Sequence, residues 1–185
     1  PKKAYLYPLP PKYHRRYHVR RYGFHGISHR YVSARAAELL GRDIAELKMV
    51  ICHLGNGSSM CAVKHGESVD VTTGFGTFDG LIMGTRSGSV DPAVFFYIGK
   101  KEGLSYDQLI DLATKKSGFL GLTGLSSDHR ELEKEAFIGN ERAKLALEIQ
   151  IYQIKKYLGA FAFAMGGLDA VVFTGGIGER APSVR

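Results

Sequence analysis

Cysteine is scarce in this sequence, with two residues in a chain of 185. Two cysteines cannot build a disulfide framework, and their spacing offers no pair of metal-ligand motifs, which argues against zinc chemistry. The chain also lacks an apolar run near the roughly 20 residues that cross a bilayer. No short apolar segment follows a basic amino terminus as in a signal peptide. We therefore expect a cytoplasmic protein with no membrane segment and with both cysteines reduced and buried.

The composition is typical of a folded domain, because 44% of the residues are hydrophobic and 23% are charged. The length suits one domain over residues 1–185. The first residue is Pro1, and residues 182–185 resemble the opening turn of a helix. We therefore expect a piece of a longer protein, with flanking segments at both ends.

Positive charge is concentrated near the amino terminus. The net charge is +7, and residues 1–37 hold nine basic and no acidic residues, which leaves 16 basic and 18 acidic residues elsewhere. Basic residues interleaved with aromatic ones can bind single-stranded nucleic acid, so this function is one alternative. We favour the other interpretation, a solvated arm interrupted by Pro8, Pro10 and Pro11.

The first half of the chain predicts a helix and then a meander of strands. Ser28 is suited to cap a helix that stops at Gly41, and Asp43 with Glu46 predicts a capping box for a short turn. Three strand-like segments follow, at residues 49–54, 59–64 and 68–73.

The second half predicts helices and a final strand. Asp91 and Pro92 signal one helix start, and Ser105 with Gln108 signals another. Further expected elements are a charged helix from about residue 131, a long and mostly buried helix over 140–165, and a strand over 168–174. This order resembles half of an α/β domain of the actin-like, ribonuclease-H-like ATPase class.

Glycine-rich loops are expected at four places, where the backbone could approach a phosphate closely and donate N–H groups to it. They lie at residues 55–58, 74–88, 117–124 and 175–179. No Walker A pattern occurs, which excludes a P-loop. Residues 176–181 fit G-x-G-x-x-A after a strand, a weak match to a dinucleotide fingerprint.

The Asn56-Gly57 pair predicts a two-residue hairpin of type I′, which needs a positive φ at both centres. A hairpin centred there places Cys52 opposite Cys61 and puts His53 on the other face of its strand. His53 could then donate to a phosphate, or simply satisfy backbone groups at the end of the strand.

Five collinear motifs resemble signatures of the acetate kinase family and together cover nearly the whole chain. They are residues 20–29 (RRYGFHGISH), 53–66 (HLGNGSSMCAVKHG), 83–92 (MGTRSGSVDP), 117–130 and 173–179 (FTGGIGE). The resemblance implies a two-domain homodimer of actin-like fold, in which residues 1–185 form most of the second nucleotide-binding domain. Such an enzyme transfers the γ-phosphoryl group of ATP to acetate, with magnesium, and gives acetyl phosphate and ADP.

The resemblance also implies roles for particular residues. A carboxylate needs no general base, so catalysis depends on alignment and on stabilising charge in the transition state. His25 and Arg86 match the groups that stabilise this charge, and the fork of Arg86 can bind oxygens bidentately. The matched ATP-binding positions are His53, Leu54, Gly55, Asn56 and Gly57 at the phosphates, Asp128, His129 and Arg130 at the nucleoside, and Gly176, Ile177, Gly178, Glu179 and Arg180 at adenine.

The sequence departs from the family pattern in two places. Residues 76–80 read GTFDG where the family usually has Thr-Pro-Leu-Glu-Gly. The family's proline helps to line the acyl pocket, so propionate kinase is an alternative activity. Arg180 stands where the family commonly has Asn. The Mg²⁺ ligands and an active-centre aspartate are expected outside this chain.

Two alternatives of a different class remain. One is a nucleic-acid-binding fragment that uses the basic arm, and the other is a nucleotide-binding regulatory module without catalysis. We expect instead that the ligands are ATP or ADP and acetate or another short-chain carboxylate. We expect no nucleic acid or membrane partner and expect a homodimer.

Overall fold

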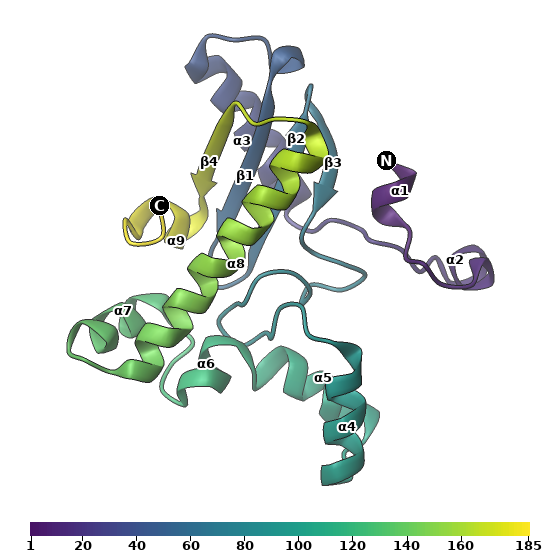
Figure 1. The fold of residues 1–185 in the computed structure, drawn as a ribbon, viewed down its shortest axis with the longest axis vertical. Coiled ribbons are helices and arrows are strands. Elements are labelled where there is room, and N and C mark those ends of the chain that lie inside the picture. Colours follow the sequence, from purple (N-terminus) through teal and green to yellow (C-terminus); the bar gives the residue numbers. More distant parts are fainter. The chain divides into compact units, whose positions relative to one another are not determined.

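The computed structural model describes residues 1–185 as two compact units (Figure 1). The first unit comprises residues 1–77 and 154–185, and the second comprises residues 78–153. The sequence predicts one domain over residues 1–185, and this stays a prediction for the complete protein. None of the helices combines the length and apolar character needed to cross a membrane.

A four-stranded sheet forms the centre of the first unit. Its strands are β1 (Lys48–Leu54), β2 (Ser58–Lys64), β3 (Glu67–Val71) and β4 (Ala170–Thr174). Their order in the sheet is β3-β2-β1-β4. The first three strands pair antiparallel in the predicted meander, and β4 runs parallel to β1. The expected α/β class is confirmed.

The hairpin between β1 and β2 differs from its prediction by one residue. Leu54 pairs with Ser58, so the loop has three residues, and neither Asn56 nor Gly57 has a positive φ. The expected type I′ turn is therefore wrong. Cys52 lies opposite Met60 instead of Cys61, which places the two cysteines on opposite faces of the sheet.

Both cysteines are free and buried, as expected. Burial raises the pKa of the Cys52 thiol to about 12 and that of the Cys61 thiol to about 11. Because the thiolate is the reactive form, both side chains are inert at neutral pH.

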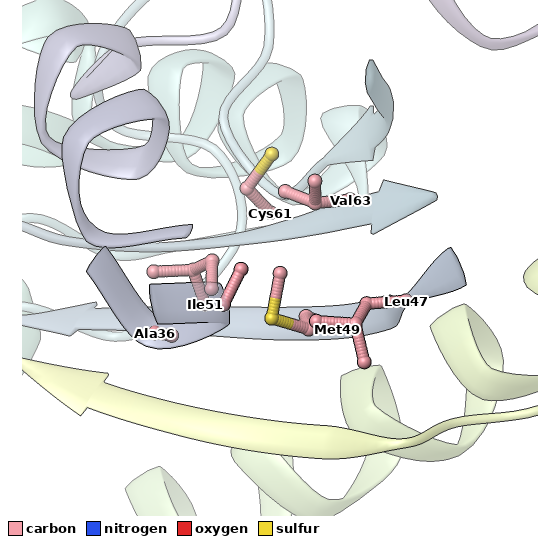
Figure 2. Close-up of a cluster of buried hydrophobic side chains, with 7 residues drawn as sticks. Ala36, Leu47, Met49, Ile51, Cys61 and Val63 are labelled. Carbon is pink, nitrogen blue, oxygen red and sulfur yellow. The ribbon is translucent and has the colours of Figure 1, made fainter. Parts of the chain in front are cut away.

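Helix α3 (Gly26–Leu40) covers one face of the sheet and closes the core of the first unit. Figure 2 shows Ala36 of α3 against side chains from β1 and β2. The buried cluster consists of Ala36, Ala37, Leu47, Met49, Ile51, Cys61 and Val63. The alternation along β1 and β2 follows the two-residue period of a strand, so every second side chain enters this core.

The ends of α3 agree only in part with the sequence. Gly41 ends the helix in the left-handed conformation as predicted, and its N–H donates to the carbonyls of Ala37 and Glu38. The predicted cap Ser28 is wrong, because His25 occupies the N-cap position with φ 63° and the Ser28 hydroxyl contacts His53. The short helix η1 (Ile44–Glu46) begins after Asp43, whose carboxylate accepts from the Ala45 N–H and not from Glu46.

The basic arm contains two short helices, α1 (Lys2–Tyr5) and α2 (Pro11–Tyr17). Arg21 ties the arm to the sheet edge, because its guanidinium donates to the carbonyls of residues 71, 72 and 73 at 3.2, 3.0 and 2.7 Å. The Arg20 guanidinium lies 4.0 Å from the ring centre of Tyr5. Part of the arm's charge and aromatic surface is therefore used within the fold.

The second unit is helical. Its first two helices are α4 (Pro92–Glu102) and α5 (Tyr106–Lys115), and both of their predicted caps are present: Asp91 for α4, and a Ser105–Gln108 capping box for α5. The remaining complete helices are α6 (Gly118–Thr123) and α7 (His129–Phe137), which starts two residues before the predicted residue 131. The unit's core contains Ile82, Phe119, Leu132, Ala143 and Ala146.

The expected glycine-rich loop at residues 117–124 is wrong, because α6 occupies most of it. Gly118 begins the helix at φ +64°, and Gly124 ends it in the left-handed conformation. The glycines therefore serve the two ends of a short helix, where positive φ is needed.

Two further helices are α8 (Glu141–Met165), which continues from the second unit into the first, and α9 (Gly175–Arg180). Helix α9 occupies the glycine-rich loop expected at residues 175–179, so that expectation is also wrong. The bounds of α8 agree with the prediction to within one residue. Its expected burial is wrong in extent, because Leu145 is 55% exposed and Tyr152 is 70% exposed. The buried side is a narrow stripe of Ala143, Ala146, Gln150, Ile154, Phe161 and Met165.

Candidate active site

Two glycine-rich turns lie side by side at the end of the sheet where β1 and β4 terminate: the hairpin loop at residues 55–57 and the first turn of helix α9 at residues 175–178. Because β1 and β4 are parallel, their carboxyl ends meet there, and His53 of β1 pairs with Thr174 of β4. Gly175 adopts φ +79°, and a Cβ on it would lie 2.6 Å from the Leu54 carbonyl oxygen. Only glycine fits this approach. Ligands of α/β proteins commonly bind beyond the carboxyl ends of parallel strands.

The turn of α9 combines a packed residue with exposed ones. Gly178 is buried, and a Cβ there would lie 3.5 Å from both the Cys52 oxygen and Phe173. Gly176, Glu179 and Arg180 are exposed, and Ile177 is half-buried. In the neighbouring hairpin Asn56 is exposed and its two flanking glycines are half-buried. Both turns therefore offer backbone and side-chain groups to a ligand.

Three histidines gather at the same end of the sheet, on the face that α3 covers. The rings of His25 and His53 stack, with 4.2 Å between centroids and 25° between planes. His29 is buried beside them, at 6.4 Å from His25 and 6.3 Å from His53. The α-helical spacing of four residues places His25 and His29 on the same side of α3.

Two serine hydroxyls hold this histidine cluster. Ser59 Oγ lies 2.8 Å from His25 Nδ1 and 2.7 Å from His29 Nε2. Ser28 Oγ lies 2.8 Å from His53 Nδ1. Neither serine was predicted from the sequence as part of the site. The correct hairpin register would have indicated Ser59, because it lies directly opposite His53.

Burial keeps two of these rings neutral. Burial, helped by repulsion from His53 and His25, lowers the pKa of His29 to about 4. Burial also lowers the pKa of His53, although the nearby Glu179 carboxylate acts in the opposite direction. At neutral pH His29 and His53 therefore act as hydrogen-bonding groups and carry no charge.

In the second unit the loop that carries Arg86 is clamped to α6. The N–H groups of Phe119 and Leu120 donate to the carbonyls of Met83 and Gly84, both at 2.9 Å. A Cβ on Gly118 would lie 2.2 Å from the Met83 oxygen and 2.7 Å from the Arg86 oxygen. This use of Gly118 was not predicted from the sequence. The clamp holds the backbone of half-buried Arg86 in a defined place.

Asp128 and Arg130 form a bidentate ion pair at the start of α7. The Arg130 guanidinium donates to the two carboxylate oxygens at 3.1 and 2.6 Å. This side-chain bond and the Arg130 backbone N–H lower the pKa of Asp128 to about 2. Arg130 is exposed at the surface, so its guanidinium stays accessible.

The side chain of His129, by contrast, lies in the core of the second unit. It is 4% exposed, its Nε2 lies 3.1 Å from Gln150 Oε1, and its ring packs edge-on against Phe119. Its imidazole is therefore turned away from any ligand at the surface.

Nowhere in the chain do three or more His, Cys, Asp or Glu side chains come together in a group that could hold a metal ion. The carboxylate of Asp128 is already engaged by Arg130.

Comparison with known proteins shows the family. Residues 1–185 match the sequence model of the acetokinase family. The acetate kinases of Pseudothermotoga lettingae and Thermotoga maritima are each 55% identical to this chain, over 185 and 186 residues. The alignments cover 100% of this chain and 46% of each relative. The chain thus spans about half the length of these relatives.

Solved structures of acetate and propionate kinases also resemble this chain. The crystal structure of Porphyromonas gingivalis acetate kinase matches with a TM-score of 0.98 at 51% identity, and covers 100% of this chain and 46% of that one. A propionate kinase from Francisella tularensis matches with a TM-score of 0.95 at 41% identity, covering 100% and 47%. The neighbours have the actin-like ATPase fold, which confirms the expected fold class. The chain belongs to the acetokinase family.

Proposed function

We propose that this chain is the central part of an acetate kinase, which transfers the γ-phosphoryl group of ATP to acetate and releases acetyl phosphate and ADP. The observation that carries the proposal is the meeting of two glycine-rich turns with the stacked rings of His25 and His53 at one end of the sheet. Because the chain spans 46% of its relatives, the activity is proposed for the complete polypeptide.

Phosphoryl transfer to a carboxylate requires hydrogen-bond donors to the phosphoryl oxygens and does not require a general base. Acetate is ionised at neutral pH and can attack the γ-phosphorus directly, so the enzyme has to align the two substrates and stabilise charge on the phosphoryl oxygens. His25 donates to one of these oxygens, and Arg86 binds two oxygens with its planar fork. The hairpin from His53 to Gly57 holds the phosphates of the nucleotide.

Each unit carries candidate nucleoside-binding residues. In the second unit these are Asp128 and Arg130, whose ion pair fixes the direction of both side chains. Gly176 to Arg180 line the adenine pocket. His129 contributes only its backbone, because its side chain is buried. Mg²⁺, which neutralises phosphate charge in such transfers, is held by residues outside this chain.

The basic arm has a structural role in this proposal. Arg20 and Arg21 already contact Tyr5 and three backbone carbonyls, which favours a role in folding over nucleic-acid binding. We also propose that the complete protein is a cytoplasmic homodimer.

Propionate kinase is the second candidate, supported by the match to the Francisella propionate kinase and by Thr77 and Phe78 at the positions of the family's acyl-pocket proline and leucine. One methylene changes binding in an apolar pocket by about 1 to 3 kcal/mol. We therefore expect both acids to be phosphorylated. A preference above roughly 200-fold for either acid would mean that simple packing by this loop does not set selectivity.

The test is an assay of the complete polypeptide with ATP, Mg²⁺ and acetate, in which hydroxylamine traps the acyl phosphate. We expect ADP and trapped acyl hydroxamate in equal amounts. ATP binding without hydroxamate would instead support a regulatory module, and salt-sensitive binding of an oligonucleotide without ATP binding would support the nucleic-acid alternative.

A further inference from the structure

Ser59 connects two histidines through one hydroxyl group. Its Oγ lies within hydrogen-bonding distance of His25 Nδ1 at 2.8 Å and of His29 Nε2 at 2.7 Å. Ser59 is fully buried in β2, and His29 is 4% exposed. A hydroxyl has one proton to donate, so it can donate to only one of these nitrogens, and the Ser59 hydroxyl has no hydrogen-bond partner in the protein besides these two rings. The protonation of the two rings is therefore linked.

The environment of His29 sets the direction of this chain of hydrogen bonds. Its ring carries a single proton at neutral pH, because burial and the neighbouring rings lower its pKa to about 4. Its Nδ1 is buried and has no hydrogen-bond partner within the protein. A proton on Nδ1 would leave a buried N–H unpaired, which is rarer in proteins than an unpaired acceptor. The proton therefore lies on Nε2 and is donated to Ser59.

The proton on His29 Nε2 determines where the protons of Ser59 and His25 lie. Ser59 accepts from His29, and a buried O–H without an acceptor is costly, so the Ser59 O–H points to the remaining acceptor beside it, His25 Nδ1. An Nδ1 that accepts a hydrogen bond carries no proton, and the proton of a neutral His25 then resides on Nε2. We propose that His29 and Ser59 act as positioning residues, which fix His25 in the tautomer that donates from Nε2. This inference rests on the proposed function for its purpose, because donation to a phosphoryl oxygen requires a protonated Nε2.

The sheet register explains how Ser59 comes to this place. Ser59 pairs with His53 across β1 and β2, so its side chain points to the same face as that histidine and α3. His25 precedes α3 at a left-handed N-cap with φ 63°, and His29 lies one turn later. The first turn of α3 lies beside Ser59 of β2, so His25 Nδ1 and His29 Nε2 both reach the Ser59 hydroxyl.

The direct test is ¹⁵N nuclear magnetic resonance of the complete protein with labelled histidine, at neutral pH and without substrate. The two-bond couplings between each ring nitrogen and the carbon-bound ring protons distinguish the two tautomers of each imidazole. We expect the proton on Nε2 in both His25 and His29. A proton on Nδ1 of either ring would overturn the proposal, and this result needs no variant that has to fold.

Ser59→Ala tests the link, with Ser28→Ala as its matched control, because Ser28 contacts His53 and not His25. In Ser59→Ala we expect the His25 signals to shift toward a mixture of tautomers. We also expect kcat to fall by about 10- to 100-fold, as is typical when the partner that orients a functional histidine is lost, with the KM for ATP nearly unchanged. In Ser28→Ala the His25 tautomer should persist.

An unchanged His25 tautomer in folded Ser59→Ala would contradict the proposal. The result of the tautomer test can be distinguished from the result of the test of the proposed function. If the protein makes no acyl phosphate while the wild-type tautomers are as expected, the proposed function fails and the hydrogen-bond chain stands.

Discussion

The imidazole rings of His25 and His53 stack with 4.2 Å between their centroids and 25° between their planes. The two residues are 28 positions apart in the chain, and they meet because α3 begins beside the carboxyl end of β1. Each ring contacts a serine through its Nδ1. These contacts within the protein fix the orientation of both rings, and fixed donors are the condition for electrostatic stabilisation without reorganisation.

Replacing Gly118 by alanine should displace the Arg86 loop. The new Cβ would lie 2.2 Å from the Met83 oxygen and 2.8 Å from the Arg86 nitrogen, at φ +64°. We expect a loss of at least about 2 kcal/mol in the free energy of unfolding, and a fall in kcat in the fraction that folds. Urea unfolding and steady-state kinetics of the complete protein measure both.

Gly124→Ala is the matched control, because it has φ +67° but no atom within 4 Å of its Cβ. It carries only the cost of the left-handed backbone, about 1 kcal/mol. Equal effects of the two substitutions would show that contact with the Arg86 loop does not matter.

Replacing Gly175 by alanine should separate the two glycine-rich turns. Its Cβ would lie 2.6 Å from the Leu54 oxygen, so β1 and the start of α9 must move apart. We expect a loss of about 1 to 3 kcal/mol in stability and weaker ADP binding. Gly176→Ala is the control for stability, because its Cβ meets nothing within 4 Å. A folded Gly175→Ala protein with normal stability and ADP affinity would remove the close approach from the site.

Acid should destabilise the protein through His29. Its folded-state pKa of about 4 lies below the ordinary histidine pKa of 6.5, so the unfolded chain binds more protons between these values. The stabilisation is complete above about pH 6.5 and is lost as the pH falls toward 4, by up to on the order of 3 kcal/mol. Urea unfolding of the wild type and His29→Gln at several pH values measures the difference. Parallel pH profiles for the two proteins would contradict this assignment.

Local sequence chemistry predicted the elements whose signals lie within a few residues. The Ser105–Gln108 capping box, the Asp91–Pro92 helix start and the stop at Gly41 depend only on their neighbours, and all three are present. The strand positions of β1 and β2 were also predicted to within one residue.

Features that depend on distant contacts were missed. The Asn56–Gly57 pair is compatible with a two-residue turn, but pairing of Leu54 with Ser58 selects a three-residue loop, and this shift concealed Ser59. Serine is a favourable residue type for a helix N-cap, yet the Ser28 hydroxyl contacts His53 of β1. At residues 117–124 the glycines indicated a loop, although the segment forms a helix in which Gly118 packs against the Arg86 loop and Gly124 ends the last turn. The roles of the candidate site residues stay predictions.

The kinetics of Arg86 variants test the proposed phosphoryl transfer most directly. If the Arg86 guanidinium stabilises charge that develops during transfer, Arg86→Ala in the complete enzyme should lower kcat by on the order of 100-fold or more. Nucleotide affinity should change much less, because the hairpin and the turn of α9 belong to other segments. Arg86→Lys should recover little, since the ammonium lacks the planar fork. A thermal melt of the same variants distinguishes this role from a purely structural one, which would lower Tm and leave turnover in the folded fraction. A near-normal kcat in folded Arg86→Ala would contradict the catalytic assignment.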